Sequence, residues 1–306
     1  MRSILSLRDL STSDLESVLK RAAQLKKEIK KETELHQLKG KVVGLLFEKP
    51  STRTRTSFEV ATLRLGGNAL YLPSTELQLS RGEPIKDTAR ILGSYLNIIV
   101  GRVYQQDTLQ QLADFSRIPV INGLSDVEHP TQIISDFLTI QEVKGRLKGI
   151  KFAYIGDGDN VCNSLLLGAS MVGMDIAVGC PSGYEPNPDI LKLAQQNAKL
   201  SGSSVAVVND PKKAAIGADV LYTDVWVSMG EEKERNRRMH AFRGFQINSN
   251  LLKVAAKDSI VMHCLPAHRG VEITDEVIEG KHSVVWQQGE NKLYGAAATL
   301  EFVVKS

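Results

Sequence analysis

Short runs of apolar residues recur along the chain, separated by longer segments whose apolar residues follow helical spacing. Several runs are continuous instead of alternating, which is typical of strands buried on both faces of a parallel sheet. Strands that alternate with helical segments predict an α/β fold in which helices flank mostly parallel sheets. The predicted strands cover residues 42–47, 98–103, 119–121, 152–155, 176–178, 205–208, 220–222, 260–262 and 284–286.

The first forty residues show a helical pattern instead. Residues 11–13 (Ser-Thr-Ser) are typical of a helix N-cap. The apolar face that follows is formed by Leu15, Val18, Leu19 and Ala22. The charged run at 26–34 then indicates the solvated end of the same helix.

The organisation changes near residues 141–150. A long helix is predicted after Pro130, and its apolar face contains Ile133, Ile134, Phe137, Leu138 and Ile140. Gly145 and Gly149 bracket a basic turn before the next strand begins. We therefore expect two domains, residues 1–140 and 141–306, with a ligand site between them at the carboxyl ends of their strands.

Composition is consistent with a two-domain enzyme. The 306 residues exceed what one hydrophobic core usually serves, and 42% are hydrophobic and 24% charged. The net charge of +3 argues against binding of nucleic acid or a membrane surface. No apolar stretch reaches membrane-spanning length, and Arg2, Arg8 and Asp9 argue against a signal peptide.

The three cysteines suggest a reducing, cytoplasmic setting. Cys162, Cys180 and Cys264 form an odd, sparse set without CxxC spacing, so neither a disulfide framework nor a structural zinc site is expected. We interpret Cys162 and Cys180 as small buried hydrophobic residues.

A polar segment at residues 51–57 (Ser-Thr-Arg-Thr-Arg-Thr-Ser) follows the first predicted strand and precedes a helix that begins near Phe58. Hydroxyls, backbone N–H groups and two arginines therefore gather at a helix N-terminus. Unpaired amides and the helix dipole favour an anion there, and arginine adds a bidentate fork. The segment predicts a phosphate site.

Two further features fit beside an anion site. His129 precedes Pro130 at the start of a predicted helix, where it could donate a hydrogen bond to a carbonyl oxygen. Arg102 ends a predicted strand and could converge on the same oxygen. Each is weak evidence alone, because a histidine here can simply cap the helix and an arginine at a strand end is usually solvated.

Three polar segments follow strands in the second half. Residues 156–160 (Gly-Asp-Gly-Asp-Asn) differ from a dinucleotide fingerprint because Val161 stands where a third glycine is required. Asp224, followed by Ser-Met-Gly at 228–230, suits the ammonium and carboxylate of an amino acid. Residues 263–270 (His-Cys-Leu-Pro-Ala-His-Arg-Gly) leave a cysteine nucleophile, a metal site and a polar pocket all open.

Together these segments resemble the aspartate/ornithine carbamoyltransferase family. The match extends from residues 51–55 through 129–132 (His-Pro-Thr-Gln) to 263–266. The first two segments look like those shared by the whole family. Asp224 with residues 228–230, and the run at 263–270, look like the ornithine branch.

The resemblance implies transfer of the carbamoyl group from carbamoyl phosphate to the δ-amine of L-ornithine, giving L-citrulline and phosphate, without metal or organic cofactor. It implies a carbamoyl phosphate-binding domain at 1–140 and an ornithine-binding domain at 141–306, whose C-terminal helix returns to the first domain. It also implies a homotrimer or a multiple of trimers, with active sites near subunit interfaces.

The resemblance also assigns residues. The catalytic residues would be Arg102, His129 and Cys264. Carbamoyl phosphate would contact Ser51, Thr52, Arg53, Thr54, Gln78, Arg102, His129, Pro130, Thr131, Gln132, Cys264, Leu265 and Lys292. Gln78 matches a position that reaches a neighbouring subunit's active site. Ornithine would contact Asn160, Asp224, Ser228 and Met229.

Two positions depart from the family pattern. Asp159 stands where asparagine is common, and Lys292 where arginine is usual. Lysine keeps the charge but loses the bidentate fork. Three alternatives stay open: a carbamoyltransferase acting on a related amine such as putrescine or N-acetylornithine, a thiol hydrolase using Cys264 and His263, and a non-catalytic subunit of the same fold.

Overall fold

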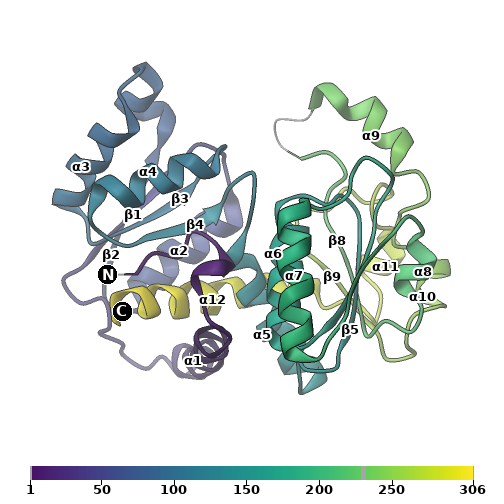
Figure 1. Cartoon of the computed structure of the whole chain (residues 1–306). Coiled ribbons are helices and arrows are strands. Elements are labelled where there is room, and N and C mark those ends of the chain that lie inside the picture. The colour runs from purple at the N-terminus through teal and green to yellow at the C-terminus, as the bar shows by residue number, and fades with distance from the viewer. Residues whose placement is uncertain (1, 229–231, 306) are drawn as a thin grey trace. The chain divides into compact units, whose positions relative to one another are not determined.

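A computed structural model describes residues 2–228 and 232–305 and divides the chain into two compact units. The first contains the residues up to Leu138 and those from Glu290 onward, and the second runs from Thr139 to Gly289. Each unit holds one parallel sheet flanked by helices (Figure 1). The predicted fold class is therefore confirmed.

The first unit has a four-stranded sheet in the order β2-β1-β3-β4. Its strands are β1 (Val42–Phe47), β2 (Asn68–Pro73), β3 (Ile98–Arg102) and β4 (Val120–Leu124), and all pairs are parallel. The central strand β3 is buried along its whole length, as its continuous apolar run predicts. Ile4 adds a parallel bridge to Ile121 beside β4.

Helices and short 3-10 turns surround this sheet. They are η1 (Leu7–Asp9), α1 (Thr12–Lys30), α2 (Thr52–Arg64), η2 (Ser74–Glu76), η3 (Gln78–Arg81), α3 (Ile85–Tyr95) and α4 (Gln106–Ser116). Ser11 caps α1 through a capping box with Asp14, and Leu15, Val18, Leu19 and Ala22 are buried, as predicted.

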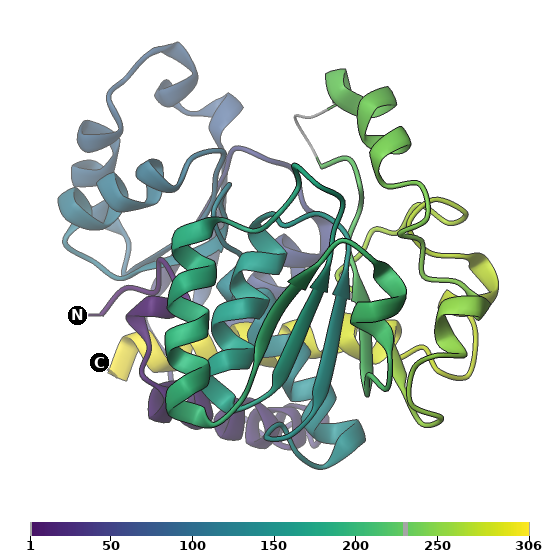
Figure 2. The same ribbon diagram turned by 45° about the vertical axis from the view of Figure 1, so that its right-hand side comes forward.

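The second unit has a five-stranded sheet in the order β7-β6-β5-β8-β9. The strands are β5 (Lys151–Ile155), β6 (Asp175–Gly179), β7 (Val205–Val208), β8 (Val220–Thr223) and β9 (Ile260–His263), and every pair is parallel. The polar loops that follow β5, β8 and β9 therefore leave the same edge of the sheet (Figure 2).

The helices of the second unit cover both faces of its sheet. Two long helices lie on one face, and three short ones lie on the other (Figure 1). The first group is α6 (Asn160–Val172) and α7 (Pro188–Ser201), and the second is α8 (Pro211–Ala215), α10 (Ser249–Leu252) and α11 (Asp275–Ile278). A 3-10 turn, η4 (Glu232–Glu234), leads into α9 (Arg235–Ala241).

Two long helices contain residues of both units. They are α5 (Pro130–Lys144) and α12 (Val285–Lys305). The five residues predicted to form the apolar face of α5 are all fully buried, and so are its polar neighbours Asp136 and Thr139. No helix among the residues described is long and apolar enough to cross a membrane.

The prediction of a strand at 284–286 was wrong. This short run instead begins α12, and only Ser283 makes an isolated bridge, to Val261. The strand β2 was missed, because it lies at the edge of its sheet and is partly exposed, without a continuous apolar run. The strand predicted at 119–121 extends further, to Leu124, through the polar residues Asn122 and Gly123.

Candidate active site

The carboxyl ends of β1 and β3 place Arg102 in the first unit. Arg102 pairs with Phe47 in the parallel register, and its carbonyl accepts the Glu48 N–H at 2.8 Å. The pairing with β4 shifts by one residue between Gly101 and Arg102, and Arg102 then pairs with Leu124. Its side chain is 8% exposed. The sheet thus holds a buried guanidinium at its carboxyl edge, next in space to the strand that leads into α2.

The N-terminus of α2 follows β1 directly. Ser51 is extended and caps the helix, its Oγ accepting the Thr54 N–H at 3.2 Å. Thr52 and Arg53 form the first turn, where unpaired backbone N–H groups and the helix dipole favour an anion. Thr54 is buried, whereas Thr52 is exposed and Arg53 is intermediate. This geometry supports the predicted phosphate site.

Arg55, the second arginine of the segment, is engaged elsewhere. Its Nε lies 3.0 Å from Glu59 Oε1, one helical turn along. Its guanidinium also stacks over the Tyr71 ring at 3.6 Å from the centroid. Sequence reasoning grouped both arginines at the helix start, but tertiary contacts fix Arg55 against its own helix and β2.

His129 immediately precedes α5 and is 4% exposed. Burial, reinforced by the positive charges of Lys292 and Arg102, holds the pKa of His129 well below its usual range. The imidazole is therefore neutral at physiological pH, so one ring nitrogen carries a proton that it can donate. Pro130 begins the helix, where a missing N–H is harmless, and Thr131 follows buried.

A chain of buried polar side chains continues from α5 to α12. Gln132 donates from Nε2 to Asp136 Oδ1 at 2.7 Å and accepts from Lys292 Nζ through Oε1. Gln132 is 1% exposed and Lys292 7%. The structure therefore brings together Arg102, His129, Gln132 and Lys292. A buried ammonium beside a neutral imidazole favours an anionic partner.

Gln78 stands apart from this group along the chain. It begins η3, and its carbonyl accepts the Glu83 N–H at 3.2 Å. Its side chain is exposed in the single chain.

In the second unit, side chains join the carboxyl ends of β5 and β8 and the loops that follow them. Thr223 Oγ donates to the Ile155 carbonyl at 2.6 Å, and Ser228 Oγ donates to Asp159 Oδ2 at 3.2 Å. Asp159, one of the two residues that depart from the family pattern, thus accepts a hydrogen bond from the predicted ornithine loop. Asn160 begins α6 and is half-buried. Met229 lies outside the described residues.

Gly158 is required by a close approach of two backbones. A Cβ at this position would lie 2.3 Å from Pro186 N and 2.4 Å from Glu185 C. The Gly158 N–H also donates to the Tyr184 carbonyl at 2.9 Å. The glycine therefore allows the close packing of the turn between β5 and α6.

Asp157 pairs with Arg238 of α9, a contact that sequence reasoning did not find. Both residues are 7% exposed. Arg238 also donates to the Trp226 carbonyl at 3.3 Å and stacks over the Tyr184 ring at 5.2 Å. Arg238 therefore ties α9 to both the β5 and β8 loops. Residues 231–238 are almost all charged, and such a run gives no local signal for a buried ion pair.

Asp224, His263 and Cys264 gather at the ends of β8 and β9. All three are buried, and one potential ligand atom from each lies within 4.8 Å of the others. Both ring nitrogens of His263 are engaged, because Nδ1 accepts the Leu265 N–H at 2.8 Å and Nε2 lies 3.1 Å from Glu272 Oε1. Binding a metal, or taking a proton from Cys264, would require His263 to give up one of these contacts.

Leu265 has a left-handed backbone, with φ of 59°. Such a conformation is costly for a non-glycine residue and is maintained by its surroundings. Here the bond from its N–H to His263 holds it. His263 is itself fixed by Gln288, whose Oε1 accepts the His263 backbone N–H at 2.9 Å. Sequence reasoning missed Gln288 and Glu272, which lie 25 and 9 positions from His263 and gave no local pattern.

Comparison with known proteins decides the family. The model of the aspartate/ornithine carbamoyltransferase carbamoyl-P binding domain matches residues 2–142, and that of the Asp/Orn binding domain matches residues 148–303. The chain belongs to the aspartate/ornithine carbamoyltransferase family.

Relatives within this family match over almost their whole length. The chain is 52% identical over 299 residues to the ornithine carbamoyltransferase of Methanosarcina mazei, covering 98% of each chain. It superimposes on the ornithine carbamoyltransferase of Pyrococcus furiosus with a TM-score of 0.96 at 48% identity, covering 100% of this chain and 97% of the other. The anabolic ornithine carbamoyltransferase of Campylobacter jejuni gives 0.94 at 43%, covering 99% of each chain.

Proposed function

We propose that this protein transfers the carbamoyl group of carbamoyl phosphate to the δ-amine of L-ornithine, forming L-citrulline and phosphate. The observation that carries the proposal is the neutral, buried His129 flanked by Arg102 and Lys292. A neutral donor beside two cations suits a substrate that combines a carbonyl oxygen with a phosphate dianion. The names of the relatives favour the same reaction.

The proposed chemistry begins with the δ-amine attacking the carbamoyl carbon. Negative charge develops on the carbonyl oxygen, where His129, Arg102 and Arg53 donate hydrogen bonds. Each such donor contributes on the order of 3 kcal/mol of transition-state stabilisation. The phosphate then leaves from the N-terminus of α2, where Ser51, Thr52 and Thr54 hold it. The C–N bond forms in the attack, and the C–O bond to phosphate breaks afterwards, as the carbonyl double bond re-forms.

The amine must be deprotonated to attack, although a lysine-like amine has a pKa of about 10.4. A partly buried site lowers this pKa by penalising charge. In the proposal the Cys264 side chain and the Leu265 backbone lie beside the reacting nitrogen. The hydrogen bond from the Leu265 N–H to His263 Nδ1 fixes the orientation of this peptide. Phosphate can take up the released proton, so no side-chain base is required.

Ornithine recognition is assigned to the second unit. Asp224 is 9% exposed and would bind the α-ammonium. Asn160 and the Ser228-Met229 segment would bind the α-carboxylate. Lys292, Gln132, Pro130 and Thr131 would complete the carbamoyl phosphate site. Residues 1–140 would then form the carbamoyl phosphate-binding domain, and residues 141–306 would form the ornithine-binding domain, whose C-terminal helix returns to the first domain.

We further propose a homotrimer, or a multiple of trimers, in the cytoplasm. Gln78 would then enter a neighbouring subunit's active site, which agrees with its exposure in one chain. Leu63 of α2 is 61% exposed and Leu70 of β2 is 49% exposed. Such large apolar side chains in the same unit suit a subunit interface. Three free, buried cysteines suit a reducing compartment.

A panel of amines tests the proposed reaction. Ornithine should exceed putrescine and N-acetylornithine in kcat/KM by at least about a hundredfold, because each analogue leaves a buried polar group unpaired. Asp224→Asn should lose most ornithine turnover and keep carbamoyl phosphate binding. Equal use of putrescine by the unmodified protein would overturn the choice of ornithine. Absence of carbamoyl transfer to any amine would overturn the function itself.

A further inference from the structure

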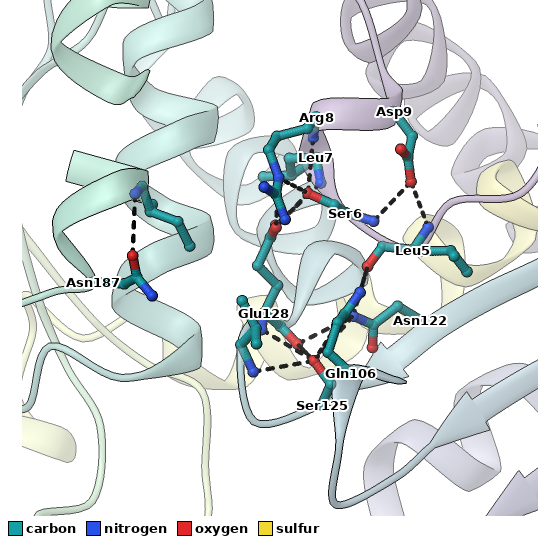
Figure 3. A network of polar contacts seen from close by, with 12 residues as sticks. Leu5, Ser6, Leu7, Arg8, Asp9, Gln106, Asn122, Ser125, Glu128 and Asn187 are labelled. Atoms are coloured by element: carbon teal, nitrogen blue, oxygen red, sulfur yellow. Dashed lines mark hydrogen bonds and ion pairs between the residues drawn. The ribbon is translucent and has the colours of Figure 1, made fainter. Parts of the chain in front are cut away.

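The N-terminal segment lies along the free edge of β4 in the first unit. Ile4 N–H donates to the Val120 carbonyl at 2.9 Å, and Asn122 N–H donates to the Ile4 carbonyl at 2.8 Å. Beyond Ile4 the segment turns into η1, and there its contacts change from β4 to the loop that precedes His129 (Figure 3). Residues more than a hundred positions apart are thus packed together.

Glu128, the residue before His129, receives this segment. Its carboxylate accepts hydrogen bonds from Ser6 Oγ and from the Leu7 N–H, the latter at 3.1 Å. Arg8 Nε lies 3.8 Å from Oε1, but the Arg8 side chain is 50% exposed. Glu128 itself has no exposed surface. Two neutral donors of the N-terminal segment therefore bind a buried carboxylate.

The backbone of Glu128 is fixed as well. Its carbonyl accepts the Ser125 N–H at 3.0 Å, and its N–H donates to Ser125 Oγ at 3.2 Å. Ser125 Oγ contacts Gln106 Oε1 at 2.6 Å, and Gln106 Nε2 donates to the Leu5 carbonyl at 3.1 Å. The network of Leu5, Ser6, Leu7, Gln106, Asn122, Ser125 and Glu128, drawn in Figure 3, closes on itself.

A carboxylate is a costly choice for this position. Burying a charge is unfavourable unless its partners compensate fully, and apolar residues of similar volume often give equal or greater stability. Arg8 lies 3.8 Å from the Glu128 carboxylate and is half in water, whereas Ser6 and Leu7 donate hydrogen bonds directly to it. Directed hydrogen bonds fix the position of a backbone more closely than apolar packing does. Because His129 follows Glu128 directly, a fixed Glu128 backbone restrains His129 as well.

We propose that Glu128 is a positioning residue for His129. Its carboxylate fixes the peptide from which the His129 side chain extends, and the N-terminal segment supplies the donors that hold the carboxylate. The N-terminal segment thus helps to position a residue of the proposed active site. The proposal rests on the proposed function only for its kinetic effect, because the geometry of His129 can be observed without turnover.

Three variants of the full chain test the proposal. Glu128→Met removes both acceptors at similar volume, Glu128→Gln keeps an acceptor, and Val18→Ala thins the core under α1 away from the network. With citrulline formation as the assay, Glu128→Met should lower kcat at least about tenfold, since small misplacements of a catalytic group are costly. KM for carbamoyl phosphate should change less than about threefold, because the lost interaction belongs to the transition state.

The other variants separate positioning from stability. Glu128→Gln should keep kcat within about threefold of the unmodified protein. Val18→Ala should lower the melting temperature and leave kcat unchanged. NMR of protein labelled with ¹⁵N-histidine reports the ring nitrogens, and the His129 signals are those missing from His129→Gln. These signals should shift or broaden in Glu128→Met and stay unchanged in Val18→Ala.

The outcomes are distinguishable. An unmodified protein that forms no citrulline refutes the proposed function, and the His129 signal then decides the positioning proposal alone. An active protein whose Glu128→Met variant keeps normal kcat and an unchanged His129 signal refutes the positioning proposal. Equal losses in Glu128→Gln and Glu128→Met would also overturn it, because the charge and not the hydrogen-bond geometry would then be required.

Discussion

His129 is buried beside two cations, and this environment sets its charge. Its pKa is lowered by burial first, then by Lys292 and Arg102. In the unfolded chain the same histidine has a pKa of about 6.5 and takes up a proton below that pH. The folded state resists protonation, so the contribution of neutral His129 to stability is present above pH 6.5 and is lost as the pH falls further.

This linkage predicts a difference between the protein and His129→Gln. The free energy of unfolding of the unmodified protein, minus that of the variant, should fall below pH 6.5 by at most about 1.4 kcal/mol per pH unit. Urea titrations at several pH values between 7.5 and 5 measure it. A difference that is constant over this range would show that His129 protonates equally in both states. Other titrating groups cancel in the comparison.

Arg53 and Arg55 lie at the same helix start, so alanine variants of the two form a matched comparison. Arg53→Ala should weaken carbamoyl phosphate binding by about 1.5–3 kcal/mol, the usual worth of a charged hydrogen bond. Arg55→Ala should leave binding nearly unchanged, because Arg55 is committed to Glu59 and Tyr71. Calorimetric titration with carbamoyl phosphate compares the two. Similar losses in both variants would indicate a diffuse electrostatic effect and refute a specific role of Arg53.

At the scale of the element, the N-terminus of α2 has two separable roles. Ser51 caps the helix, and the same helix end is the proposed phosphate site. Asparagine and aspartate cap helices as well as serine does, but aspartate adds a negative charge where the phosphate would bind. Ser51→Asp should therefore retain the melting temperature and lose carbamoyl phosphate affinity.

Ser51→Asn is the neutral control for this experiment. It should retain stability and lose far less affinity than Ser51→Asp. Thermal melts and calorimetric titrations of both variants provide the comparison. Undiminished binding by Ser51→Asp would place the phosphate away from the α2 N-terminus. Loss of stability in both variants would show instead that the serine hydroxyl has packing requirements beyond capping.

At the scale of the whole molecule, the trimer proposal predicts complementation. Each active site would combine Arg53 of one subunit with Gln78 of its neighbour. Arg53→Ala and Gln78→Ala should each be nearly inactive alone. Subunits of the two variants, mixed during refolding, should regain activity, because some sites then receive both intact residues. Mixing that restores nothing, although sedimentation shows mixed trimers, would refute the role of Gln78.

The main elements could be predicted because their signals are local. The continuous apolar runs of β1, β3 and β9 and the N-cap of α1 each lie within a few neighbouring residues. The edge strand β2 and the start of α12 could not be predicted from local signals, because both depend on tertiary neighbours. An edge strand is half solvated, and a three-residue apolar run fits a strand or a helix equally well.

The sequence by itself determined the alternation of strands and helices, and hence the fold class, because periodicity is a local property, and its motifs carried the resemblance to the family. Only the tertiary structure decided which charged groups are buried and what they contact. Arg55 pairs with Glu59, and Asp157 pairs with Arg238. Both ring nitrogens of His263 make contacts, and the N-terminal segment binds the Glu128 carboxylate. These outcomes depend on residues distant in sequence, and the free energy of a charge is set by the solvent and partners that the fold leaves around it.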